Sequence, residues 1–125
     1  MADVKALDEL IVEQMPDALI CSDADGTITR WNEAAETLIG YSAREALGQN
    51  LDLIIPTQLR AAHWRGFREA MESGVTKHHG QAVLTGVTHK DGTRIYAEVA
   101  FSLIKAEGGK AIGSVATARP KKRDA

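Results

Sequence analysis

A single histidine, His63, lies on the apolar face of a predicted helix and is the residue best suited to chemistry in this sequence. Apolar and small residues between positions 59 and 70 recur at the spacing of one helical stripe, and the charged residues lie off its centre. An imidazole directed at a core needs a partner, because a buried polar group without a hydrogen bond is costly. That partner is a backbone carbonyl, a structural water or a metal centre held inside the domain. The stripe consists of Leu59, His63, Gly66, Phe67 and Ala70.

The other residues that could do chemistry favour structural roles. Cys21 is the only cysteine, so it provides neither an internal disulfide nor a paired-cysteine metal site. Asp23 and Asp25 are spaced to cap a turn and do not match a calcium loop. Trp31 is expected to pack at a sheet edge, and Trp64 to cover a helix flank or a dimer contact. The chain has no nucleophile elbow, phosphate-binding glycine loop or kinase phosphoacceptor motif, so we expect no enzyme activity.

Size and composition predict one soluble globular domain. The chain has 125 residues, of which 44% are hydrophobic and 26% charged, which is enough to bury a core without a structural metal. A net charge of -2 does not favour nucleic-acid binding, which needs clustered positive charge. No apolar run approaches the roughly 20 residues of a membrane span, and no signal peptide is present. Together with the single cysteine, these features indicate a cytoplasmic protein without direct membrane contact.

The first half of the chain reads as a helix, a hairpin and two short helices. Residues 1–13 form an amphipathic helix whose apolar positions include Val4, Leu7 and Ile11; alone it is marginal, so it must dock on the domain or on a second chain. Strands at 18–22 and 27–31 flank a turn that contains glycine. Asn32 is placed to cap a helix from Glu33 to Ile39. Ser42, with Glu45 three residues later, predicts a capping box on a second helix that stops at Gly48.

The second half reads as one long helix followed by three strands. The helix is expected to open at Pro56, to carry His63 and to end at Gly74. Strands follow at 81–88, 94–104 and 111–118, with the strong turn 89–92 between the first two. The order predicts an α+β domain, with a five-stranded antiparallel sheet and helices on one face. Its expected parts are the N-terminal helix at 1–13, the domain at 14–118, and a linker or chain end at 119–125.

The stretch from Pro16 to Gly48 resembles the opening of a PAS domain, the sensory module of kinases, cyclases and transcription regulators. The segments Ile54-Ile-Pro56, His89-Lys-Asp-Gly-Thr93 and 109–117 follow in the family's order, so the resemblance covers roughly residues 14–118. It implies a five-stranded PAS fold with a ligand between the sheet and the helices, a sensory rather than enzymatic role, and an effector domain elsewhere in the full-length protein.

Within that family, the segment from Leu59 to Gly92 is similar to the haem-binding PAS domains of FixL-type oxygen sensors, whose helix histidine is the proximal iron ligand. The resemblance places that ligand, the metal site, on His63. It implies distal positions at His78, Val99 and Phe101, and departs from the pattern at Val83 and Glu69, where FixL-type sensors have arginines that serve bound oxygen and a propionate. The residues expected to contact the cofactor are His63, Leu59, Phe67, His78, Val83, Val99 and Phe101.

The resulting hypothesis is a homodimeric sensory PAS domain that binds haem b through His63 and senses redox state or a diatomic gas such as O2, CO or NO. The departures make O2 the least favoured of these gases. His78 and the adjacent His79 could supply a second ligand or be exposed loop residues. Two alternatives stay open: a PAS domain that binds another metabolite, such as a fatty acid or an aromatic compound, in the same cleft, and a ligand-free module for dimerisation and signal relay.

Overall fold

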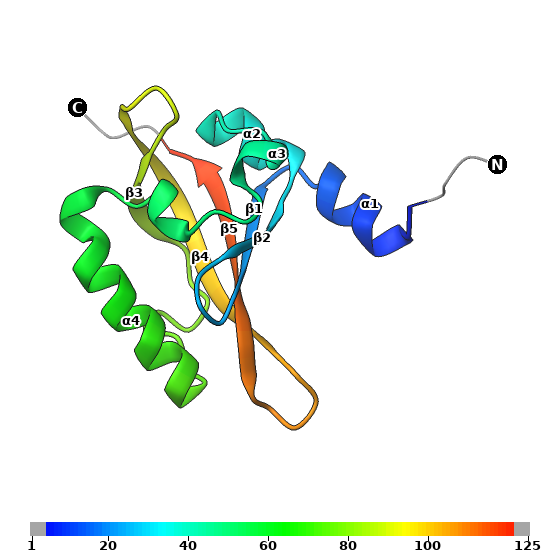
Figure 1. Ribbon diagram of the computed structural model, residues 1–125, viewed down its shortest axis with the longest axis vertical. Coiled ribbons are helices and arrows are strands. Elements are labelled where there is room, and N and C mark those ends of the chain that lie inside the picture. The colour runs from blue at the N-terminus through cyan, green and yellow to red at the C-terminus, as the bar shows by residue number, and fades with distance from the viewer. Residues whose placement is uncertain (1–4, 122–125) are drawn as a thin grey trace.

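The computed structural model describes residues 5–121, and these residues form a mixed helix and sheet fold (Figure 1). The five strands are antiparallel and lie in the spatial order β2-β1-β5-β4-β3, so the first and last strands of the chain are neighbours at the centre. The predicted fold class is confirmed. In chain order the strands are β1 (Ala18–Asp23), β2 (Ile28–Trp31), β3 (Val83–Thr88), β4 (Arg94–Lys105) and β5 (Ala111–Pro120).

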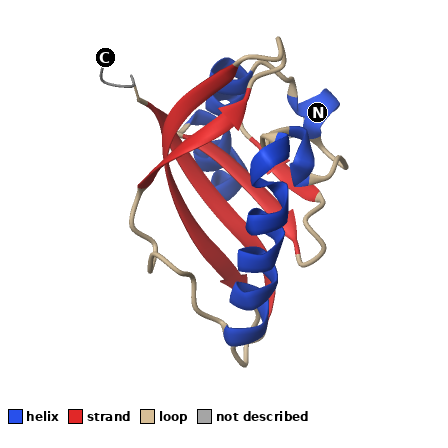
Figure 2. Ribbon diagram, turned by 90° about the vertical axis from the view of Figure 1, so that its left-hand side faces the viewer, coloured by secondary structure: helices blue, strands red, loops and turns tan. Residues whose placement is uncertain are grey.

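The helical segments other than α1, which precedes β1, connect β2 to β3 and supply one wall of the domain. They pack apolar residues such as Ile39 and Phe67 against the sheet, where Ala97 is fully buried. Figure 2 shows the long helix running across the sheet. The helical segments are α1 (Leu7–Gln14), α2 (Glu33–Ile39), α3 (Ala43–Ala46), the 3-10 turns η1 (Leu51–Leu53) and η2 (Thr57–Leu59), and α4 (Arg60–Ser73).

The capping signals in the sequence operate as predicted. The Asn32 side chain accepts a hydrogen bond from the backbone of α2, and Ser42 and Glu45 form a complete capping box on α3. Gly40 ends α2 and Gly74 ends α4, both with a left-handed backbone that a residue without a Cβ adopts at little cost. These local interactions fix the lengths of the helices that surround the candidate site.

The N-terminal helix was predicted at residues 1–13 and is observed as α1. Residues 1–4, and with them Val4 of the predicted stripe, lie outside the described residues. None of the residues of α1 is buried, and Leu7 and Ile11 are 73% and 57% exposed. In the view of Figure 1, α1 lies on the opposite side of the sheet from α4. The apolar stripe of α1 is therefore mostly uncovered within one chain.

Most predicted boundaries differ from the observed ones by one or two residues, and three differences affect the description of the fold. The long helix was expected to open at Pro56, but the chain first makes the 3-10 turn η2, with Leu59 donating to the Pro56 carbonyl, and α4 starts at Arg60. The strand expected from residue 81 begins at Val83. The last strand was expected to end at Ala118, but β5 continues to Pro120 because β4 still pairs with it there. β1 begins at Ala18, which pairs with Ala118, so β1 does not extend as far as Pro120. Pro120 therefore has a neighbouring strand on one side only, where its missing amide donor is tolerated.

Candidate functional site

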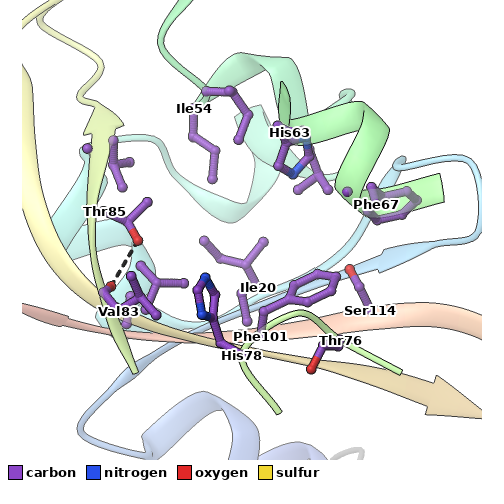
Figure 3. Close-up of a pocket in the computed structure, with 18 of the residues that line it drawn as sticks. Ile20, Ile54, His63, Phe67, Thr76, His78, Val83, Thr85, Phe101 and Ser114 are labelled. Carbon is purple, nitrogen blue, oxygen red and sulfur yellow. Dashed lines mark hydrogen bonds between the residues drawn. The ribbon is translucent and has the colours of Figure 1, made fainter. Parts of the chain in front are cut away.

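A partly open cavity of about 360 Å³ lies between the helices and the inner face of the sheet. Its volume falls within the roughly 300 to 1,000 Å³ that small-molecule sites occupy. Apolar side chains from α2, the segment 51–55, α4 and four strands form most of the wall (Figure 3). Most of the polar side chains in the wall lie in the segment 76–81, which connects α4 to β3. The cavity is suited to a largely apolar ligand with a few polar contacts.

His63 projects from α4 into the wall of this cavity. Its ring packs edge-on against Trp64, with centroids 4.7 Å apart, and lies 6.0 Å from the Phe67 ring. Within residues 5–121, the His63 Nδ1 atom is the one buried side-chain nitrogen or oxygen that has no hydrogen-bond partner. Nδ1 of His63 therefore does not bond to a backbone carbonyl, which was one of the partners expected from the sequence.

Burial lowers the pKa of His63 below its usual value of 6.5, because the charged imidazolium loses hydration in the apolar wall. The carboxylate of Asp52 acts in the opposite direction and is the weaker influence. Burial thus favours the neutral form of the ring, which is the form of imidazole that ligates metals. The combination of a neutral ring and a buried, unpartnered nitrogen fits a residue that is prepared for a ligand.

Five of the six other predicted contact residues join His63 around the cavity. Phe67 comes from α4, His78 from the connection that follows, Val83 from β3, and Val99 and Phe101 from β4. The rings of Phe67 and Phe101 lie 6.3 Å apart, so the helix and the sheet meet at this pair. The structure thus brings together residues separated by as many as 38 positions in the chain, from His63 to Phe101.

Leu59 was predicted to line the site, but the structure places it outside the cavity wall. The side chain is 40% exposed and is not part of the cavity wall. The prediction assumed continuous α-helical spacing from Pro56, whereas Leu59 belongs to η2. A 3-10 turn has about 3.0 residues per turn instead of 3.6, which rotates Leu59 away from the stripe of His63. Glu69 is exposed on α4 and does not line the cavity.

Several wall residues were not anticipated from the sequence. Ile20 of β1, Ile54 and Ala116 of β5 contribute apolar surface. Ser114 also lines the cavity, and its hydroxyl shares a 2.6 Å hydrogen bond with that of Ser22. The alternation along β5 could have identified Ser114 and Ala116 as one face, but which face meets the cavity depends on the pairing of β5 with β1 and β4.

The residues assigned to structural roles occupy positions that fit those roles. Trp31 is buried, and its Nε1 donates to the Tyr41 carbonyl. Asp23 accepts hydrogen bonds from the backbone of Asp25 and Thr27 and so caps the first turn. Cys21 is buried in β1 and its pKa is raised by burial. Trp64 lies against the turn at Gly26, as expected for a residue that covers a flank of the helix.

Residues 5–121 contain neither a multi-ligand metal site nor a membrane-spanning helix. No group of three or more histidine, cysteine, aspartate or glutamate side chains is placed to hold a metal ion. No helix in the described part of the chain is long and apolar enough to cross a membrane.

Comparison with known proteins identifies the family. The model of the family described as PAS fold matches residues 6–121, nearly all of the chain, so the chain belongs to the PAS family. The oxygen sensor protein DosP of Escherichia coli strain K12 is 34% identical over 96 residues, which are 77% of this chain and 12% of that protein. Sensor protein FixL of Bradyrhizobium diazoefficiens is 42% identical over 53 residues, which are 42% of this chain and 10% of that protein. The chain thus spans about a tenth of the length of these curated relatives.

Solved structures agree on the fold. The PAS domain of a protein from Colwellia psychrerythraea superposes with a TM-score of 0.78 at 24% identity, covering 91% of this chain and 93% of that one. The PAS domain of the RpfR quorum-sensing receptor from Cronobacter turicensis, in complex with C12:0, superposes with a TM-score of 0.69 at 17% identity, covering 89% and 99%. This chain is accordingly a sensory PAS domain related to oxygen sensors and to a signal transduction histidine kinase.

Proposed function

We propose that this PAS domain binds b-type haem through His63 and senses a diatomic gas or redox state. The observation that carries the proposal is the His63 imidazole, which lines an apolar cavity with its buried Nδ1 unpartnered. A porphyrin supplies four of the ligands of its iron, so it needs one or two side chains from the protein, whereas an ordinary metal site needs three or more. The 34% sequence identity with an oxygen sensor protein, which extends over 77% of this chain, supports the proposal.

In this proposal His63 holds the iron, and the apolar wall holds the ring and keeps out water. Phe67, Val99 and Phe101 exclude solvent from the site. Bound haem supplies an iron that can take a small gas or change its oxidation state. Val83 offers no hydrogen-bond donor at the position where FixL-type sensors have an arginine, so we expect CO, NO or redox state, rather than O2, to be the signal.

The signal would leave through the elements attached to the cavity. α4 carries His63, and β5 lines the cavity and leads to the C-terminal end of the domain. On the other side, the Asn32 amide donates to the carbonyl of Val12 in α1. Leu7 and Ile11 are exposed on α1, and we propose that they pair with the same helix of a second chain. A homodimer of a cytoplasmic protein would then pass the change to an effector domain in the full-length chain.

The cavity also supports a second candidate, a PAS domain that binds an apolar metabolite such as a fatty acid. The nearly complete apolar lining favours it. A ligand-free relay module is the least supported of the three, because a cavity of about 360 Å³ within a close-packed domain is costly unless it is filled.

Absorption spectroscopy distinguishes these candidates. The purified chain, incubated with haemin and freed of excess, should show a Soret band with one haem per chain. His63→Ala should lose that band, whereas His79→Ala, which changes a histidine outside the cavity wall, should keep it. A colourless protein would overturn haem binding. Stabilisation of that colourless protein by dodecanoic acid, measured as a rise in Tm, would then favour the metabolite.

A further inference from the structure

We infer that His78 would be a second protein ligand of the haem iron, beside His63. The inference rests on the proposed function. His78 lines the same cavity as His63 but comes from a different wall. Figure 3 shows its ring pointing into the cavity from beside Val83 and Phe101, while His63 enters from the helix above.

The turn that follows α4 determines which of two adjacent histidines faces the cavity. His79 has a φ of 53°, and Gly80 follows with a φ of 80°. A positive φ is uncommon for a residue with a side chain and carries a cost in energy. The His79 amide donates to the Thr76 carbonyl and the Gln81 amide to the His78 carbonyl, which closes the turn. The result is that His78 contributes to the cavity wall and His79 does not.

The donors around the cavity leave few other choices for a second ligand. The hydroxyl of Thr85 donates to the Val83 carbonyl, and that of Ser114 is bonded to Ser22. Of the side chains that commonly hold haem iron, histidine, cysteine, methionine and tyrosine, the cavity wall formed by the described residues contains His63 and His78 alone. Imidazole is a common axial ligand of haem iron, and a second one completes the coordination that the porphyrin and His63 begin.

The position of His78 also makes it a ligand that can leave. The residue is exposed, and it lies in a connection outside the helices and strands. Such segments open locally at low cost compared with the core. An external gas must then compete with His78, and its apparent affinity equals its intrinsic affinity multiplied by the fraction of molecules in which His78 is not bound. Departure of His78 would be a movement of the α4–β3 connection that depends on the signal.

Spin state provides the test. The haem-loaded chain should be low-spin in the ferric form by absorption and electron paramagnetic resonance, and His78→Ala should become high-spin while retaining its Soret band. Added imidazole should restore the low-spin spectrum of His78→Ala. His79→Ala is the matched control and should stay low-spin. If His78 is bound in about nine molecules of ten, its removal should tighten CO binding about tenfold.

Failure of the His78 assignment can be distinguished from failure of haem binding by His63. A loaded wild-type chain that is high-spin, or a His78→Ala chain that remains low-spin, would overturn the assignment of His78 and leave haem binding by His63 intact. A chain that takes up no haem would overturn both proposals. Because His78 is exposed and outside the regular elements, its replacement is not expected to impair folding.

Discussion

The indole Nε1 of Trp64 donates a 2.7 Å hydrogen bond to Oδ1 of Asp52, and this bond attaches the helix of His63 to the segment before it. Arg60, one turn earlier in α4, donates to the carbonyls of Ile55 and Asp52. The first two turns of α4 are therefore held to the segment 52–55 on both sides of His63. This attachment sets the position of the histidine in the cavity wall.

Removing the indole donor should loosen α4. Trp64→Phe retains a ring against Phe67 but loses the bond to Asp52, and because the acceptor is charged we expect a loss of about 2 kcal/mol in the free energy of unfolding. Urea denaturation measures this loss, and hydrogen exchange should show faster exchange in α4 than in β5. Asp52→Asn keeps an acceptor oxygen and should cost less. Equal losses in the two variants would mean that the bond does not hold the helix.

Gly66 is a site where a larger residue should stabilise the chain. It lies in the middle of α4, and a Cβ added there meets no atom within 4 Å. Gly66→Ala should raise the free energy of unfolding by about 1 kcal/mol, because alanine restricts the unfolded chain and favours the helix. Gly26→Ala is the contrasting variant: Gly26 has a φ of 85° and its Cβ would collide with the Trp64 ring, so a loss is expected. Thermal unfolding of both variants measures the expected gain for Gly66→Ala and the expected loss for Gly26→Ala.

Asn32 is expected to be a critical polar residue of the fold. Its side chain is 2% exposed, accepts from the amides of Leu19 and Ala35, and donates to the carbonyls of Val12 and Asp17. Asn32→Ala removes all four bonds and should cost about 2 kcal/mol or more.

A second asparagine cap provides the control for Asn32. Asn50 accepts from the Asp52 amide at the exposed start of η1, and Asn50→Ala should cost about 0.5 kcal/mol. Chemical denaturation of both variants measures the difference. Equal losses in the free energy of unfolding would mean that the burial of Asn32 and its hydrogen bond to α1 add no stability.

The ion pair between Lys90 and Glu45 predicts a dependence of stability on pH. The bond from Lys90, at 2.6 Å, and then the Ser42 backbone amide hold the pKa of Glu45 below its usual value of 4.5. The folded chain therefore binds this proton less readily than the unfolded chain. The resulting stabilisation is present above the unfolded pKa and is lost as pH falls through the folded pKa.

Glu45→Gln isolates this effect because the amide retains an acceptor for Ser42. Its Tm should be lower than that of the wild type at neutral pH and should converge with it as the pH falls below 4.5. About 1 M salt should reduce the difference by screening the exposed pair. Glu72→Gln, an exposed change on α4, is the control and should show no such convergence. A difference that is constant with pH would contradict the assignment.

The sequence by itself determined the fold class and the elements, because hydrophobic period and capping are local properties. The strand expected at 94–104 is β4, and the expected caps Asn32 and Ser42 bond to the backbone amides of Ala35 and Glu45, only three residues away. The helical stripe likewise placed His63 and Phe67 on one face, where they line the cavity.

The tertiary structure decided which further residues meet at that face, beyond those that the family resemblance placed there. Ile20 and Ser114 reach the cavity through the pairing of β1 with β5, a contact across some 90 residues that no local pattern encodes. Leu59 lies outside the cavity wall because it belongs to the 3-10 turn η2. The tighter winding of that turn points its side chain in a different direction from the α-helical stripe of His63. His78 joined it because the backbone reverses at His79 and Gly80. The local hydrophobic period determines which side chains share one face of a helix or strand, whereas packing between elements determines which distant residues that face contacts.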